Sequence, residues 1–141
     1  MTKAPPGIEI STDQQRLKLP DVVRLLRSAY WSANRAEDVA EKSLRNSLVF
    51  GAYDGAELIG LTRVVTDYAT FAWLCDVIVD ERYRGRGIGK ALVEAALTHP
   101  ELKGMRRWIL ATRDAHALYR RFGFTELAGP ERWLELYDPA R

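Results

Sequence analysis

Few folds accommodate a glycine-rich loop that lies directly between an apolar run and a helical stripe. The run 71–79 is rich in aromatic and branched residues and predicts a buried strand. Apolar residues recur at helical spacing over 88–97 and predict a helix. The loop between them, Arg84 to Lys90, reads Arg-Gly-Arg-Gly-Ile-Gly-Lys. We therefore expect a strand, a tight turn and a helix in immediate succession.

The same loop predicts an anion-binding site. A helix N-terminus presents unpaired N–H groups and the positive end of the helix dipole, and glycines let the backbone approach a phosphate. Arg84 and Arg86 add fixed positive charge. A P-loop would need glycine in place of Arg84 and serine or threonine in place of Ala91, and a dinucleotide fingerprint would need glycine in place of Lys90. Both of these nucleotide motifs are therefore excluded.

The remaining periodicities predict a mixed α/β sandwich. Strands are expected at 8–11, 48–53, 57–66, 108–111, 124–128 and 132–137, and helices at 20–31, 35–45 and 114–122. Because a helix joins the strands at 71–79 and 108–111, these two should lie parallel. The other strand neighbours should be antiparallel.

Length and composition favour one ordinary domain. The chain has 141 residues, of which we expect 1–7 to form a disordered lead and 8–141 to form a single domain. A formal charge of +2 argues against a nucleic-acid partner, and no apolar run approaches the length of a membrane span. The single cysteine, Cys75, excludes a disulfide framework and a multi-cysteine zinc site, and it favours a reducing cytoplasm.

An acyl-CoA pattern is present in the loop. Arg84, Gly87 and Gly89 satisfy Arg/Gln-x-x-Gly-x-Gly/Ala and follow the apolar run Val77-Ile78-Val79. The stretch 74–92, together with Ala-His-Ala-Leu-Tyr-Arg-Arg-Phe-Gly-Phe at 115–124, closely resembles the two signature segments of the GNAT N-acyltransferases. The resemblance is specific over 71–125 and loose before 48.

The resemblance implies a fold, a cosubstrate and a set of site residues. The fold is a mostly antiparallel central sheet with one parallel, splayed strand pair and flanking helices, and the cosubstrate is acetyl-CoA, with no metal. N–H groups of the loop would bind the CoA pyrophosphate, and two valines would bind the pantetheine through their backbones. These cofactor-binding residues are Val77, Val79, Arg84, Gly85, Arg86, Gly87, Ile88, Gly89 and Lys90. Glu81 and Thr112 depart from the family pattern, which usually has proline and asparagine there.

The predicted reaction is acetyl transfer to a primary amine by direct attack on the thioester. The signature region has no Ser-His-Asp or Cys-His constellation, which is consistent with transfer without a covalent enzyme intermediate. The acceptor would be an amine of a small molecule, an amino acid or a protein. A noncatalytic acyl-CoA-binding or sensing module is the alternative, and the enzyme is a possible homodimer.

Two residues are candidates for catalysis. The resemblance gives Tyr119 the role of general acid toward the departing thiolate; the other interpretation is a core aromatic. Asp76 lies in an apolar run, where an unpaired carboxylate would be costly to bury. Either it pairs with an arginine, or it faces the acceptor and holds its ammonium group. The second role is implied by a resemblance: Cys75-Asp76 stands where polyamine acetyltransferases of this superfamily have an acidic pair that meets the acceptor amine, and only the second acid is present here. Cys75 itself is expected to be a small buried hydrophobe.

Overall fold

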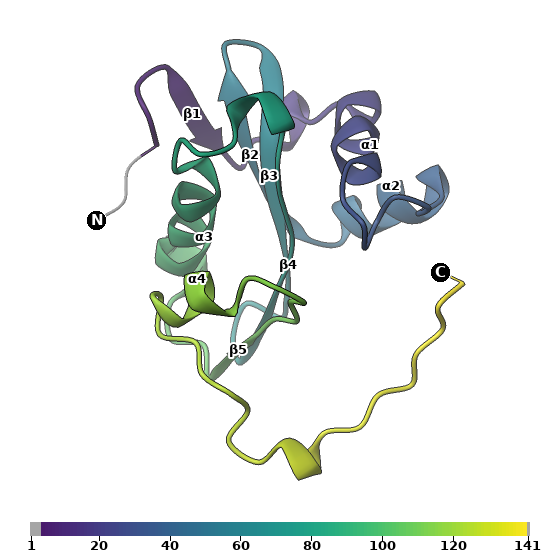
Figure 1. The fold of residues 1–141 in the computed structure, drawn as a ribbon, viewed down its shortest axis with the longest axis vertical. Coiled ribbons are helices and arrows are strands. Elements are labelled where there is room, and N and C mark those ends of the chain that lie inside the picture. The colour runs from purple at the N-terminus through teal and green to yellow at the C-terminus, as the bar shows by residue number, and fades with distance from the viewer. Residues whose placement is uncertain (1–3, 141) are drawn as a thin grey trace. The chain divides into compact units, whose positions relative to one another are not determined.

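The computed structural model describes residues 4–140 of the chain (Figure 1). The elements are β1 (Ile8–Ser11), η1 (Gln14–Arg16), α1 (Leu19–Arg27), α2 (Glu37–Arg45), β2 (Leu48–Asp54), β3 (Glu57–Thr66), β4 (Phe71–Val79), η2 (Glu81–Tyr83), α3 (Ile88–Thr98), η3 (Pro100–Leu102), β5 (Arg107–Ile109), α4 (His116–Arg120) and η4 (Pro130–Arg132), where η denotes a 3₁₀ turn. Within residues 4–140, no helix is long and apolar enough to cross a bilayer.

The chain falls into two compact units, one ending at Ala111 and the other beginning at Thr112. The single domain that the sequence predicts over 8–141 stays a prediction. Of the expected N-terminal lead, residues 1–3 lie outside the described part. Beyond them, the Pro5 carbonyl accepts a hydrogen bond of 3.0 Å from the Ile8 N–H.

The first unit is built on a five-stranded sheet with the order β1-β2-β3-β4-β5. Neighbours are antiparallel except β4 and β5, which are parallel, and this confirms the predicted mixed α/β class. Helices α1 and α2 lie on one face of the sheet, and α3 lies on the other (Figure 1). Both faces of the central strands are therefore covered, and β2 and β3 are buried over most of their length.

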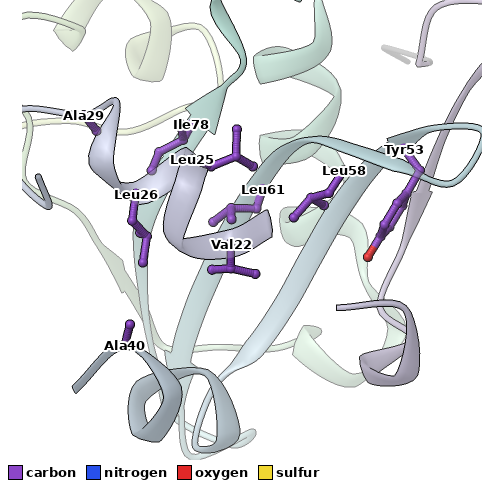
Figure 2. Close-up of a cluster of buried hydrophobic side chains, with 9 residues drawn as sticks. All are labelled: Val22, Leu25, Leu26, Ala29, Ala40, Tyr53, Leu58, Leu61 and Ile78. Atoms are coloured by element: carbon purple, nitrogen blue, oxygen red, sulfur yellow. The ribbon is translucent and has the colours of Figure 1, made fainter. Parts of the chain in front are cut away.

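The amphipathic helix α1 supplies the core on its side of the sheet. Pro20 stands in its first turn, where a missing N–H costs nothing. Val22 and Leu25 pack with Leu61 and Ile78 of the sheet in one buried cluster (Figure 2). Each such side chain contributes roughly 1.5–3 kcal/mol by leaving water. The helix ends at Arg27, earlier than the predicted residue 31.

β4 pairs with β5 only at its start and has a bulge farther along. Parallel pairing covers only the three residues from Phe71 to Trp73. Farther along, the register with β3 shifts between Leu61 and Arg63, so that two residues of β4 lie opposite Thr62. Asp76 is at this point and has a left-handed backbone with φ 53°. A bulge bends its strand and increases the local twist, which favours the parting of β4 from its parallel neighbour.

The second unit differs from the prediction. The expected strands at 124–128 and 132–137 are absent, and from 124 to 140 the structure has only the 3₁₀ turn η4. Alternating apolar residues favour a strand, but a strand forms only where a neighbour pairs with its backbone. Helix α4 is shorter than the predicted 114–122. It ends at Arg120, with Arg121 as C-cap, before the predicted Gly123; Gly123 has φ 95°, and the Phe124 N–H donates to the Tyr119 carbonyl.

Candidate functional site

The glycine-rich loop needs its glycines for backbone conformation. Gly85 and Gly87 have φ values of 79° and 82°, a region that side-chain-bearing residues rarely adopt. Gly87 is also the N-cap residue of α3. A Cβ added at either glycine would meet no atom within 4 Å. The glycines therefore do not relieve crowding within the protein; they leave the backbone open toward the space outside the loop.

The backbone N–H groups of this loop lack partners. Within residues 4–140, none of the N–H groups from 85 to 90 donates a hydrogen bond, and the first donor of α3 is Ala91, which bonds to Gly87. No side chain caps the helix. Unpaired N–H groups at the positive end of an eleven-residue helix form an anion-binding surface. This arrangement fits a pyrophosphate.

The cations of the loop are likewise uncompensated. Arg84 Nε donates to the Val79 carbonyl at 3.1 Å, which ties the loop to the end of β4. The Arg86 guanidinium lies 5.1 Å from the ring centroid of Tyr83. In the described part of the chain, neither arginine forms a salt bridge, whereas Arg82 is paired with Asp80 and Glu57. Two fixed positive charges therefore stand beside the unpaired N–H groups.

The end of β4 has backbone groups to offer a ligand. The Asp80 N–H donates to the Ile59 carbonyl of β3 at 2.8 Å. Because strand residues alternate in direction, the backbone groups of Val77 and Val79 point away from β3. Pairing with β5 has already ended at Trp73, so β5 does not take them up; of these groups, the Val79 carbonyl accepts the hydrogen bond from Arg84 Nε. An extended amide-bearing chain such as pantetheine could hydrogen-bond there in place of a strand.

Asp76 is the centre of a buried ion-pair cluster. Its carboxylate accepts hydrogen bonds from Arg35 Nη1 at 2.8 Å and Nη2 at 3.2 Å, and from Arg63 Nε at 3.0 Å. The Trp31 indole N–H donates to it at 3.0 Å. We call these four residues the Asp76 cluster. It joins β3 and β4 to the loop between α1 and α2.

The cluster decides the protonation state of Asp76. Burial alone would raise the pKa of Asp76, but the hydrogen bonds and charges of Arg35 and Arg63 outweigh it, so its pKa is lowered. Asp76 shares a buried face with Leu74 and Ile78, as strand alternation predicts. Of the two alternatives drawn from the sequence, pairing with arginine is present in the structure. A role in holding the acceptor ammonium stays a prediction.

Sequence reasoning did not identify the partners of Asp76. Arg63 offered a signal, since it is a charged residue within the apolar run of β3 and must be paired if buried. Arg35 and Trp31 offered none, because they belong to a segment between two helices, 41 and 45 residues from Asp76 in the chain. Only the tertiary fold brings them to the carboxylate.

The other two candidates have simple surroundings. Tyr119 on α4 is buried, its ring lies 6.0 Å from that of Phe124 in an edge-to-face arrangement, and burial raises its pKa. Burial raises the pKa of the Cys75 thiol to about 11, and its sulfur lies 3.3 Å from the Arg63 carbonyl oxygen. A thiol with so high a pKa is a poor nucleophile near neutral pH.

Comparisons with known proteins agree with this geometry. Residues 19–124 match the model of the acetyltransferase (GNAT) family. A crystal structure of a protein assigned to the GNAT family, from Xanthomonas campestris pv. campestris, is 39% identical, with a TM-score of 0.90 and coverage of 96% of both chains. An acetyltransferase-like protein of Gibberella zeae is 27% identical over 133 residues, which cover 78% of this chain and 74% of that protein.

A shorter match concerns an enzyme with a named substrate. Spermine/spermidine N(1)-acetyltransferase of Bacillus subtilis is 42% identical over 57 residues, which cover 37% of this chain and 38% of that enzyme. The family match spans most of the chain, including β4, the glycine-rich loop and α4. The chain therefore belongs to the acetyltransferase (GNAT) family and is an acetyl-CoA-dependent acetyltransferase.

Proposed function

We propose that this enzyme transfers the acetyl group of acetyl-CoA to a primary amine by direct attack on the thioester. The observation that carries the proposal is the junction of β4 with α3. There, unpaired N–H groups at 85–90 lie next to the end of β4, which β5 no longer pairs with. The N–H groups would bind the pyrophosphate, and Val77 and Val79 would orient the pantetheine. The acetyl group would then lie where the parallel strands part.

The amine attacks in its neutral form, after its ammonium proton has gone to solvent, and the nitrogen loses a second proton when the amide forms. Two further requirements are met by the protein. A strand N–H at the gap stabilises the negative charge that develops on the thioester oxygen during attack. Tyr119 protonates the departing thiolate, and its raised pKa means that the hydroxyl still holds its proton near neutral pH. No covalent enzyme intermediate is required, which agrees with the unreactive Cys75. Tyr119 as general acid is part of the proposal.

The acceptor is proposed to be a primary amine of a small molecule, an amino acid or a protein. The Bacillus subtilis relative acts, by its name, on small polyamines. The formal charge of +2 gives no support to a nucleic-acid partner. We further propose the cytoplasm as the compartment, because a single cysteine suits a reducing environment.

A panel of amines tests the proposed reaction. The purified protein is mixed with acetyl-CoA and each of a set of amines, amino acids and lysine peptides, and free CoA thiol is followed with a thiol reagent. At least one amine is expected to accelerate thiol release, with the acetylated amine detected by mass spectrometry. Acetyl-CoA binding without acceleration by any amine would contradict the proposal and favour a sensing module.

Replacing Gly87 tests the pyrophosphate site. Gly87→Leu is expected to weaken CoA binding at least about 10-fold, because a side chain would obstruct the approach of phosphate to the N–H groups. CoA should also raise the Tm of the wild type more than that of the variant. Gly104→Leu is the matched control, since Gly104 has φ 78° and equally open surroundings. Equal CoA affinity in both variants would place the pyrophosphate elsewhere.

A further inference from the structure

The Asp76 cluster carries more positive than negative charge. Two guanidinium groups face one carboxylate, and neither arginine has a second carboxylate within 4.0 Å among residues 4–140. The side chains of Arg35, Arg63 and Asp76 are only 18%, 10% and 3% exposed. A surplus charge on side chains that are largely withdrawn from water is costly unless a counter-ion is bound. The cluster is therefore complementary to one further anion.

The two arginines still have hydrogen-bond donors to offer. Arg63 uses Nε for Asp76 and Nη1 for the Ser47 hydroxyl at 3.0 Å, while Arg35 uses both terminal nitrogens for Asp76. Within the described chain, Nη2 of Arg63 and Nε of Arg35 donate no hydrogen bond. A guanidinium has five N–H donors in a planar fork that matches carboxylate and phosphate oxygens.

The position of the cluster suits an acceptor site. Asp76 stands at the bulge, directly before Val77, on the strand that we propose lies along the pantetheine. Trp31 contacts it from the segment between α1 and α2, the ring of Tyr30 lies 4.9 Å from that of Trp31, and both residues are about half exposed. Exposed aromatic rings beside a few fixed polar groups are typical of small-molecule sites.

We infer that Arg35 and Arg63 bind an anionic group of the acceptor, so that the acceptor is a small amine that also carries a carboxylate or phosphate. The inference rests on the proposed function and names its substrate class. Asp76 is then a positioning residue: it holds both guanidinium forks in place and leaves them a net positive charge. A purely cationic polyamine would be repelled by this surplus.

Matched pairs of acceptors test the inference. Each pair has the same amine and chain length, for example an ω-amino carboxylate and its carboxamide, or an aminoalkyl phosphate and the corresponding alcohol, with diamines as cationic members. We expect kcat/KM to be at least about 10-fold higher for the anionic member, as for one charge-assisted hydrogen bond. If the neutral or cationic members react equally well or better, the inference is wrong although the proposed reaction stands.

Two variants test whether Arg35 and Arg63 cause the preference for anionic acceptors. Arg35→Gln and Arg63→Gln should each reduce the anionic-to-neutral ratio of kcat/KM toward one, and Arg45→Gln, an exposed arginine on α2, should leave it unchanged. Both kcat/KM values of a ratio are measured on the same variant, so a lower folded fraction reduces both equally and leaves the ratio unchanged. Where a variant does not fold, a dicarboxylate without an amine is tested on the wild type. It should compete with the acceptor and not with acetyl-CoA; no competition overturns the inference.

Discussion

Replacing Tyr119 with phenylalanine is expected to lower kcat by about 100-fold or more, while the Kd for CoA stays near the wild-type value. The substitution keeps the ring that packs against Phe124 and removes only the hydroxyl. Without that proton source, the thiolate must leave as an anion or take its proton from water. About 100-fold is the lower end of general-acid contributions.

The control for this variant is Tyr68→Phe, which removes the hydroxyl of a half-exposed tyrosine on the β3–β4 turn. It should retain full turnover. Single-turnover measurements with saturating acetyl-CoA and the best amine of the panel separate chemistry from binding. Wild-type turnover in Tyr119→Phe would assign the residue to packing and would require another proton donor for the thiolate.

Asp76→Asn is expected to lower the free energy of unfolding by about 3–5 kcal/mol, because it leaves two largely buried guanidinium groups without their carboxylate. The fall in Tm should exceed roughly 10 °C for a chain of this size. Asparagine tolerates the left-handed backbone that Asp76 adopts, so the change adds little strain. Asp38→Asn, an exposed aspartate on α2, is the control and should have little effect.

The effect of Asp76→Asn should depend on pH in one direction. Because the pKa of Asp76 is lowered in the folded state, its contribution is complete above the unfolded-state pKa of about 3.9 and is lost as the pH falls below it. The stability difference between wild type and variant in urea should therefore be largest near neutral pH and shrink in acid. A constant difference would mean that the charge of Asp76 is not the cause.

Acceptor kinetics of the same variant separate the two roles of Asp76. A large loss of stability with unchanged kinetics of the folded fraction would refute any part for Asp76 in recognising the acceptor. Preserved stability with a raised acceptor KM would instead support direct contact with the acceptor amine. If the cluster positions Arg35 and Arg63 for an anion, both stability and the preference for anionic acceptors should fall, while CoA affinity stays near its original value.

Much of the first unit was accessible from local sequence patterns. A short stretch between a strand and a helix needs a tight turn, which glycines permit because they adopt positive φ, and Gly85 and Gly87 indeed have positive φ. The apolar periods of 71–79 and 88–97 agree with β4 and α3 to within one residue. The parallel pairing of β4 and β5 followed from the helix between them. For the loop, β4 and α3 the determining interactions are local, and the pairing of β4 with β5 follows a general rule for strands joined through a helix.

Two features were decided only by the tertiary structure, because they depend on contacts between distant segments: the partners of Asp76 and the absence of a strand at 132–137. The amino-acid sequence by itself determined that Asp76 must be paired, since an isolated buried carboxylate is too costly. That its partners are Arg35, Arg63 and Trp31 depends on how α1, α2, β3 and β4 pack. The segment 132–137 has the alternation of a strand, yet no strand forms in a single chain, because backbone pairing needs a neighbour that apolar alternation does not specify.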